Sequence, residues 1–242
     1  MVTKVSCFPW IGALSIGVLC LPASVSAQEG RAIAEQIAKA YGVDSWAQVE
    51  AIGFTFNIEK PKVSRSWVWE PKADRITYDG PDKKGKPVKI TYVRSQLASQ
   101  SDFIKDVVDP AFINDQYALM FPLHLAWDSA ITVQEAGTQK LPLGKGSARK
   151  VVVKYPSGVG YTPGDTWDLY LGDEGTIRQL VLHHGGSVKP SLVPVTWAGN
   201  EKAGALLFST DKRGTADGKP IHLFFTNVAV KQVGSSTWIA AK

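Results

Sequence analysis

The sequence predicts a mainly β protein of the α+β class, a curled antiparallel sheet of about eleven strands with two helical segments. Short stretches of alternating polar and apolar residues follow one another from residue 52 to residue 231, and Gly- or Pro-rich turns separate them. Only two stretches, 31–42 and 99–128, have the spacing of helices. A sheet of this size twists until it curls, so we expect a concave face that a helix or an apolar ligand fills.

The N-terminus has the features of a secretory signal peptide. An apolar run extends from Phe8 to Pro22, after a positive charge, and small residues precede a cleavage point after Ala27. The run is shorter than the roughly 20 residues that cross a bilayer. We therefore expect a signal peptide over 1–27, export to the periplasm, and one domain over 28–242 without a transmembrane segment.

Cysteine content and charge exclude several kinds of site from the mature chain. Both cysteines, Cys7 and Cys20, lie in the predicted signal peptide, which leaves no thiol for a disulfide, a metal or a nucleophile. The net charge of +5 is modest and diffuse, whereas nucleic-acid binding calls for clustered Lys and Arg. Nucleic acid is therefore not an expected partner.

The first helix and the strands after it follow from a change of period. Apolar residues recur at helical spacing over 31–42, and Gly42 stands where a helix commonly ends. The period then becomes two in AIGFTFNIE, as in a half-buried strand. Three more strand patterns follow at short spacing, which predicts a four-stranded antiparallel meander; they are VSRSWVWEP (63–71), DRITYDG (74–80) and PVKITYVR (87–94).

A helical insertion follows the meander, over 99–128. Asp109 and Pro110 have the pattern of a helix cap followed by proline in the first turn, and Phe121-Pro122 interrupts the apolar stripe. Further strands are expected near 131–135, 147–155, 165–172, 175–184, 192–199, 204–210 and 219–231.

The stretch SRSWVWEP suggests a ligand-facing wall. Side chains alternate along a strand, so Arg65, Trp67 and Trp69 share one face. We expect this face to be concave and to bind an apolar ligand, with Arg65 near the mouth for a polar head group. The alternative is that the tryptophans are core residues packed beneath helices. The rest of the predicted wall comprises Ile52, Phe54, Phe56, Tyr92, Trp167 and Trp197.

Catalytic and metal-binding motifs are weak throughout the chain. Ser157 lacks the first glycine of a nucleophile elbow. His183 and His184 are consecutive on a strand and point to opposite faces, so they are poorly placed to bind one metal. His124 and Asp128 lie one helical turn apart, so their side chains share one side of the helix. This spacing fits a metal or acid–base pair, and it also fits a histidine that caps the helix or packs in the core. We predict no catalytic residue, no metal and no cofactor.

The order of the elements resembles the periplasmic lipoprotein-carrier (LolA-like) superfamily over roughly residues 30–235. The superfamily has a strand, an Arg-Pro turn and a second strand, and the segment WVWEPKADRITYDG (67–80) resembles this order of elements. Here Glu70 stands in place of the arginine before Pro71. The resemblance is closer to the superfamily's lipid-binding and uncharacterised envelope branches than to the carriers themselves. It implies an open half-barrel lidded by helices and a non-enzymatic periplasmic carrier whose partner is a lipid or a lipidated protein.

Two other functions remain open. An envelope hydrolase or a carbohydrate-binding protein could use the same aromatic face with Glu70 or Asp168, because glycoside hydrolysis needs carboxylates beside a stacking surface. A structural partner in an envelope complex is the third possibility.

Overall fold

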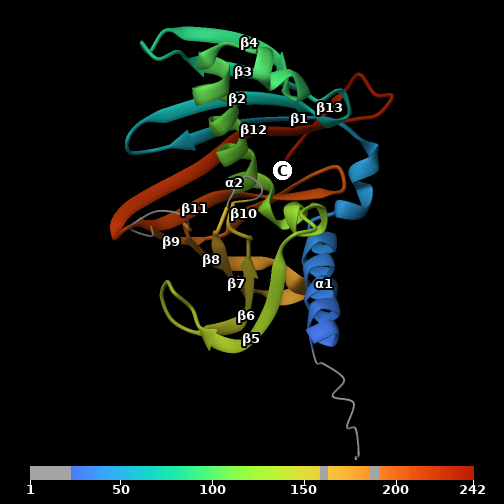
Figure 1. The fold of residues 1–242 in the computed structure, drawn as a ribbon, viewed down its shortest axis with the longest axis vertical. Helices are drawn as coiled ribbons and strands as arrows, with labels where there is room; N and C mark the ends of the chain where they lie inside the picture. The colour runs from blue at the N-terminus through green and yellow to red at the C-terminus, as the bar shows by residue number, and fades with distance from the viewer. Residues whose placement is uncertain (1–22, 159–162, 186–190) are drawn as a thin grey trace, which may run out of the picture.

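One large antiparallel sheet dominates the computed structural model, which describes residues 23–158, 163–185 and 191–242. Its strands run in the order β4-β3-β2-β1-β12-β11-β9-β8-β7-β6-β5, and β10 and β13 pair with β11 and β12 (Figure 1). The strands are β1 (Val49–Ile58), β2 (Val63–Glu70), β3 (Arg75–Pro81), β4 (Pro87–Val93), β5 (Thr132–Lys140), β6 (Ser147–Lys154), β7 (Thr166–Leu171), β8 (Ile177–His183), β9 (Leu192–Thr196), β10 (Ala198–Ala203), β11 (Leu206–Ala216), β12 (Lys219–Gln232) and β13 (Trp238–Ala240).

The predicted fold class is confirmed, with 13 strands in place of about eleven. The segment expected as one strand at 192–199 divides into β9 and β10 at Trp197. There the backbone N–H of Trp197 donates to Arg178 O at 2.8 Å, and Gly199 adopts a φ of 67°. The second added strand is β13, three residues that pair with the end of β12.

The first helix, α1 (Ala23–Ala40), begins earlier than the apolar pattern indicated. It ends as predicted before Gly42, whose φ of 86° is a left-handed conformation that favours glycine. The predicted cleavage point after Ala27 falls within this helix. Residues 1–22 of the predicted signal peptide lie outside the described residues.

The helical insertion consists of a 3₁₀ segment (Arg94–Ser99), a π segment (Ile104–Val108) and α2 (Asp109–Trp127). The prediction that Asp109 caps the helix is wrong, because the chain is already helical at Val108. The carboxylate of Asp109 instead accepts hydrogen bonds from Tyr92 Oη and Arg94 Nε, each at 2.9 Å. It therefore links α2 to the sheet.

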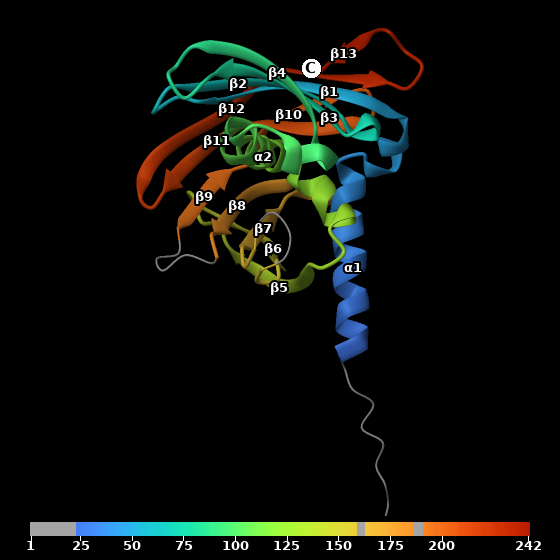
Figure 2. The ribbon, with the colours of Figure 1, turned by 45° about the horizontal axis from the view of Figure 1, so that its top comes forward.

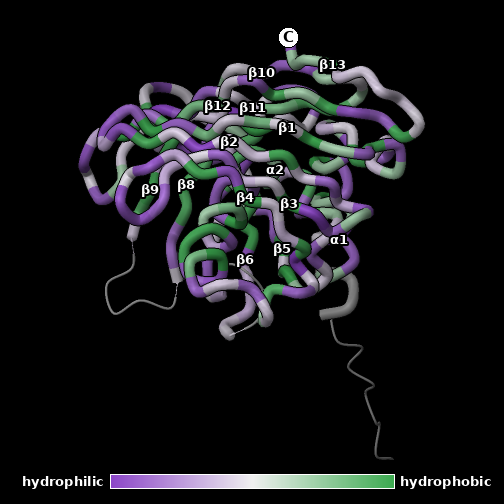
Figure 3. Tube along the Cα trace, turned by 90° about the horizontal axis from the view of Figure 1, so that it is seen from above, coloured by the Kyte–Doolittle hydropathy of each residue, from purple (hydrophilic) through white to green (hydrophobic). Residues whose placement is uncertain are grey.

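Helix α2 lies inside the curl of the sheet, with β1–β4 and β12 on one side and β5–β8 on the other (Figure 2). Hydrophobic and hydrophilic residues alternate along the strands (Figure 3), and the apolar set faces α2. The concave face and α2 thus share one core, and α1 packs beside α2 and β5.

Candidate functional site

A cavity of about 900 Å³ lies between α2 and the concave face of the sheet. Its walls come from β1, β7, β8, β9, β11 and β12, and the side of α2 that includes Ile113, Tyr117 and Ala118 covers it. Most lining side chains are aliphatic or aromatic. The volume is within the range of about 300–1,000 Å³ that is typical of small-molecule sites.

The cavity has a buried end and an open rim. On β8 the lining residues change from buried Leu180 through Leu182 to exposed His184 just after the strand, and on β7 from Trp167 toward exposed Pro163. The lining residues of β1, β9 and β11 also change from buried to partly exposed toward the strand tips. The cavity therefore runs along the strands toward their tips, and its rim also includes the exposed Pro110 and Asn114 of α2.

The structure brings all the predicted wall residues to the concave face but divides them into two groups. Phe56, Trp167 and Trp197 line the cavity. The other six lie on the half of the sheet that α2 and the segments beside it cover; they are Ile52, Phe54, Arg65, Trp67, Trp69 and Tyr92.

Trp67 and Trp69 pack against helices. Trp67 is 1% exposed, its indole N–H donates to Asp115 Oδ2 at 2.9 Å, and its ring lies 5.4 Å from that of Phe112. Trp69 also contacts Phe112, at 5.8 Å between ring centroids, and Trp127. A ligand could reach the buried ring of Trp67 only if α2 moved away, whereas Trp69 is partly exposed and also packs on Trp46. The predicted role of both tryptophans in binding stays a prediction.

Arg65 has an ion-pair partner inside the protein. Its Nε and Nη2 donate to the two oxygens of Asp115 at 2.8 and 2.7 Å, and its guanidinium lies 4.9 Å from the ring centroid of Phe56. Burial raises the pKa of Asp115, and the forked bond from Arg65 opposes that rise. A ligand head group would have to replace this carboxylate, so a head-group role for Arg65 also stays a prediction.

The cavity contains one basic group that the sequence reading missed. Lys212 on β11 lines it, is 2% exposed, and has its Nζ 4.0 Å from the ring centroid of Trp197. Burial lowers the pKa of this lysine well below its usual range. The predicted strand ended at residue 210. Had it been extended by two residues, Lys212 would have shared the inward face with Leu206 and Phe208.

The buried indole N–H of Trp167 is also notable, because it has no hydrogen-bond partner among the described residues. Its ring stacks on Phe121 of α2 at 4.0 Å between centroids, which holds it in place. Buried polar atoms are nearly always bonded, so this unbonded N–H is an exception among the described residues.

The hydrolase alternative placed Glu70 or Asp168 on the aromatic face. The structure corrects that placement, because neither carboxylate lies on this face. Glu70 forms a forked ion pair with Arg75 on the opposite side of β2 from Trp67 and Trp69. Asp168 likewise points away from Trp167, since adjacent residues alternate. It pairs there with Lys150 at 2.8 Å and His183 at 3.0 Å.

His124 belongs to a polar cluster in the core. Its Nε2 lies 2.8 Å from Gln116 Oε1, its Nδ1 lies 3.5 Å from Asp128 Oδ1, and its ring stacks on Tyr117. Burial lowers the pKa of His124, which favours the neutral imidazole. In the part of the chain that the structure describes, no three His, Cys, Asp or Glu side chains are arranged to hold a metal. His183 and His184 do face opposite ways, toward Asp168 and Asp165.

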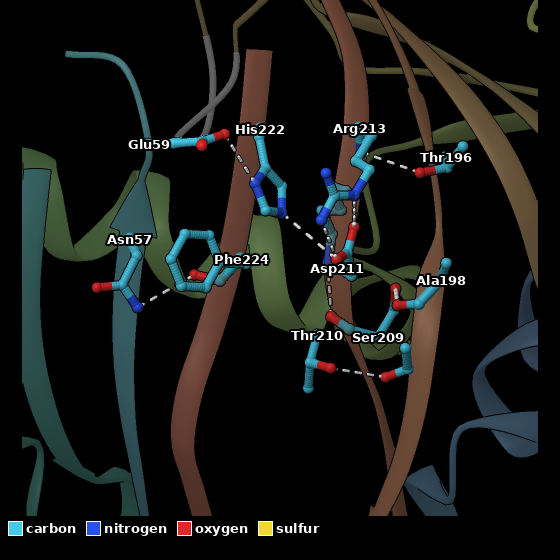
Figure 4. Close-up of polar contacts among 12 residues, drawn as sticks. Asn57, Glu59, Thr196, Ala198, Ser209, Thr210, Asp211, Arg213, His222 and Phe224 are labelled. Atoms are coloured by element: carbon cyan, nitrogen blue, oxygen red, sulfur yellow. Dashed lines mark hydrogen bonds and ion pairs between the residues drawn. The ribbon is translucent and has the colours of Figure 1, made fainter. Parts of the chain in front are cut away.

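The convex face of the same strands carries a network of charges (Figure 4). Asp211 binds Arg213 at 3.1 and 3.2 Å and approaches His222, which in turn lies 3.2 Å from Glu59. Asp211 is the chain neighbour of Lys212 but points to the opposite face. It therefore raises the pKa of the buried lysine from across the strand without pairing with it.

Comparisons with known proteins find only distant similarity. No family model matches the chain, and no curated protein matches it. A crystal structure of a DUF1329 family protein from Desulfovibrio piger has a TM-score of 0.47 at 10% identity, over 87% of this chain and 95% of that one. A proposed outer membrane lipoprotein-sorting protein domain from Vibrio parahaemolyticus has a TM-score of 0.47 at 9% identity, with the same coverage. Both TM-scores lie below 0.5, so the function of this chain is argued from its own residues.

None of the helices within the described ranges combines the length and the apolar character that a membrane crossing requires.

Proposed function

We propose that this protein is a non-enzymatic periplasmic binding or carrier protein whose cavity holds an acyl chain, either of a lipid or of a lipidated protein. The observation that carries the proposal is the cavity of about 900 Å³ beneath α2, lined mainly by apolar side chains. The predicted signal peptide supports the location.

The energetics of an acyl chain suit such a cavity. Each methylene that leaves water contributes about 0.8 kcal/mol, so a chain that is half enclosed already gains several kcal/mol. Shape rather than polar recognition then supplies most of the affinity. Opening at the strand tips gives the chain a route that leaves the core beneath α2 intact.

Two adjacent residues on β9 provide a test with a matched control. Val193 lines the cavity, whereas Leu192 faces the other way and is 45% exposed. Val193→Trp places a large ring in the cavity, and Leu192→Trp adds the same ring outside it. We expect the neutral fluorescent probe N-phenylnaphthylamine to bind the wild type and Leu192→Trp alike, and Val193→Trp at least about tenfold more weakly.

Circular dichroism of the three proteins checks that each variant is folded. If both tryptophan variants bind the probe saturably and with equal affinity, the probe binds outside the cavity. That result would contradict the proposal. Absence of saturable binding to the wild type would contradict it as well.

A further inference from the structure

Lys212 is a buried basic side chain without a counter-ion. Its Nζ donates to Ser209 O at 2.6 Å and lies 4.0 and 4.9 Å from the ring centroids of Trp197 and Phe225. Among the described residues, no carboxylate lies within ion-pair distance of it. An ammonium group has three donors, so two of them have no acceptor there.

This arrangement is costly for the protein alone. A charge removed from water is unfavourable unless a partner of opposite sign compensates for it. The aromatic rings recover part of that cost through their electron-rich faces. The nearest carboxylate along the strand, Asp211, is on the convex face with Arg213 and His222 (Figure 4). The buried end of the cavity is thus suited to an anion.

We propose that Lys212 binds the carboxylate of a single-chain fatty acid, which enters the cavity head first and leaves its hydrocarbon end toward the rim. This inference rests on the proposed function and adds to it the class and the orientation of the ligand. A carboxylate at Lys212 would satisfy the free ammonium donors in a charge-assisted hydrogen bond.

The opposite orientation is less favourable because of the charges near the rim. Asp165 lines the cavity on that side, where its carboxylate accepts a hydrogen bond from Gly185 N at 2.7 Å and contacts His184 at 3.2 Å. His184 offsets part of this charge, because the hydrogen bond with Asp165 raises the pKa of His184. A ligand carboxylate at the rim would nevertheless leave Lys212 without a partner.

Displacement of bound N-phenylnaphthylamine compares two ligands of equal chain length, dodecanoic acid and dodecanol, near neutral pH. The wild type should release the probe at a concentration of the acid at least about tenfold below that of the alcohol, although the alcohol is the more apolar molecule. Lys212→Met keeps the length of the side chain and removes its charge. In this variant the preference should disappear or reverse.

Arg213→Met is the matched control, since it removes the adjacent cation of β11 from the convex face. It should keep the preference for the acid. Equal potency of acid and alcohol in the wild type would overturn the inference, and this comparison does not depend on the folding of any variant. A preference that Lys212→Met retains would overturn it too. In both cases binding of the probe would still support the proposed function. Failure of the probe to bind at all would instead contradict the proposed function itself.

Discussion

Trp67 and Trp167 are the same residue type on the same concave face, yet they have different surroundings. Trp67 lies beneath α2 with its N–H bonded to Asp115, while Trp167 lines the cavity with its N–H unbonded. Asp109, Phe112 and Asp115 of α2 contact the β1–β4 half of the sheet directly, whereas a cavity lies between α2 and part of the β7–β9 half. Residue type and strand position alone therefore do not identify the side chains that line the cavity.

Substitution of Trp67 separates packing from binding. We expect Trp67→Ala to lower the free energy of unfolding by about 3–5 kcal/mol, since it empties a filled core site and leaves the Asp115 carboxylate with one donor fewer. Affinity for N-phenylnaphthylamine should change little in the folded variant. Denaturant unfolding and probe titration measure the two effects.

The matched control for this prediction is Trp238, which is 42% exposed and rests over Gly53 on the convex face. Trp238→Ala should cost less than about 1 kcal/mol. If Trp67→Ala were to keep its stability and lose the probe, the wall that the sequence predicted would be the binding surface after all.

At the scale of elements, two buried carboxylates attach α2 to the sheet. Asp109 binds Tyr92 and Arg94, and Asp115 binds Arg65 and Trp67. Both carboxylates lie in the first half of the helix. The second half contains Pro122 and a kink at Met120. It packs through apolar side chains, the polar cluster around His124, and a hydrogen bond that Arg31 of α1 donates to Ala126 O at 2.9 Å. The polar contacts thus fix the position of α2 over the β1–β4 half and leave the cavity beside it.

A double-substitution cycle tests this attachment. Asp115→Leu should destabilise the protein by about 3–5 kcal/mol, because Arg65 is left partly buried without its counter-ion. Adding Arg65→Met should recover most of that loss, since a buried pair replaced by apolar residues is often neutral. Chemical denaturation of the two single variants and the double variant gives the coupling energy. Additive effects of the two substitutions would contradict a direct role of this pair in holding α2.

At the scale of the whole molecule, periodicity predicted the elements well but did not predict where the cavity lies. The alternation in AIGFTFNIE and SRSWVWEP set the inward faces of β1 and β2, and the pairing of Phe54 with Trp67 follows from it. The position of α2 over the concave face depends on contacts between residues distant in sequence, such as the one between Arg65 and Asp115. The expected site was therefore centred on Trp67 and Trp69, whereas the cavity lies toward β8 and β9.

The most direct test of a ligand inside the curl is a crystal structure of the protein with terminally brominated dodecanoic acid, read from the anomalous signal of the bromine. We predict a bromine position between α2 and the β7–β9 strands, near Pro163 and His184 at the rim, with the carboxylate at Lys212. A bromine at the buried end beside Trp197 would reverse the proposed orientation and keep the site. Bound acid with its bromine only on the convex face, or beneath α2 beside Trp67, would contradict the proposed cavity.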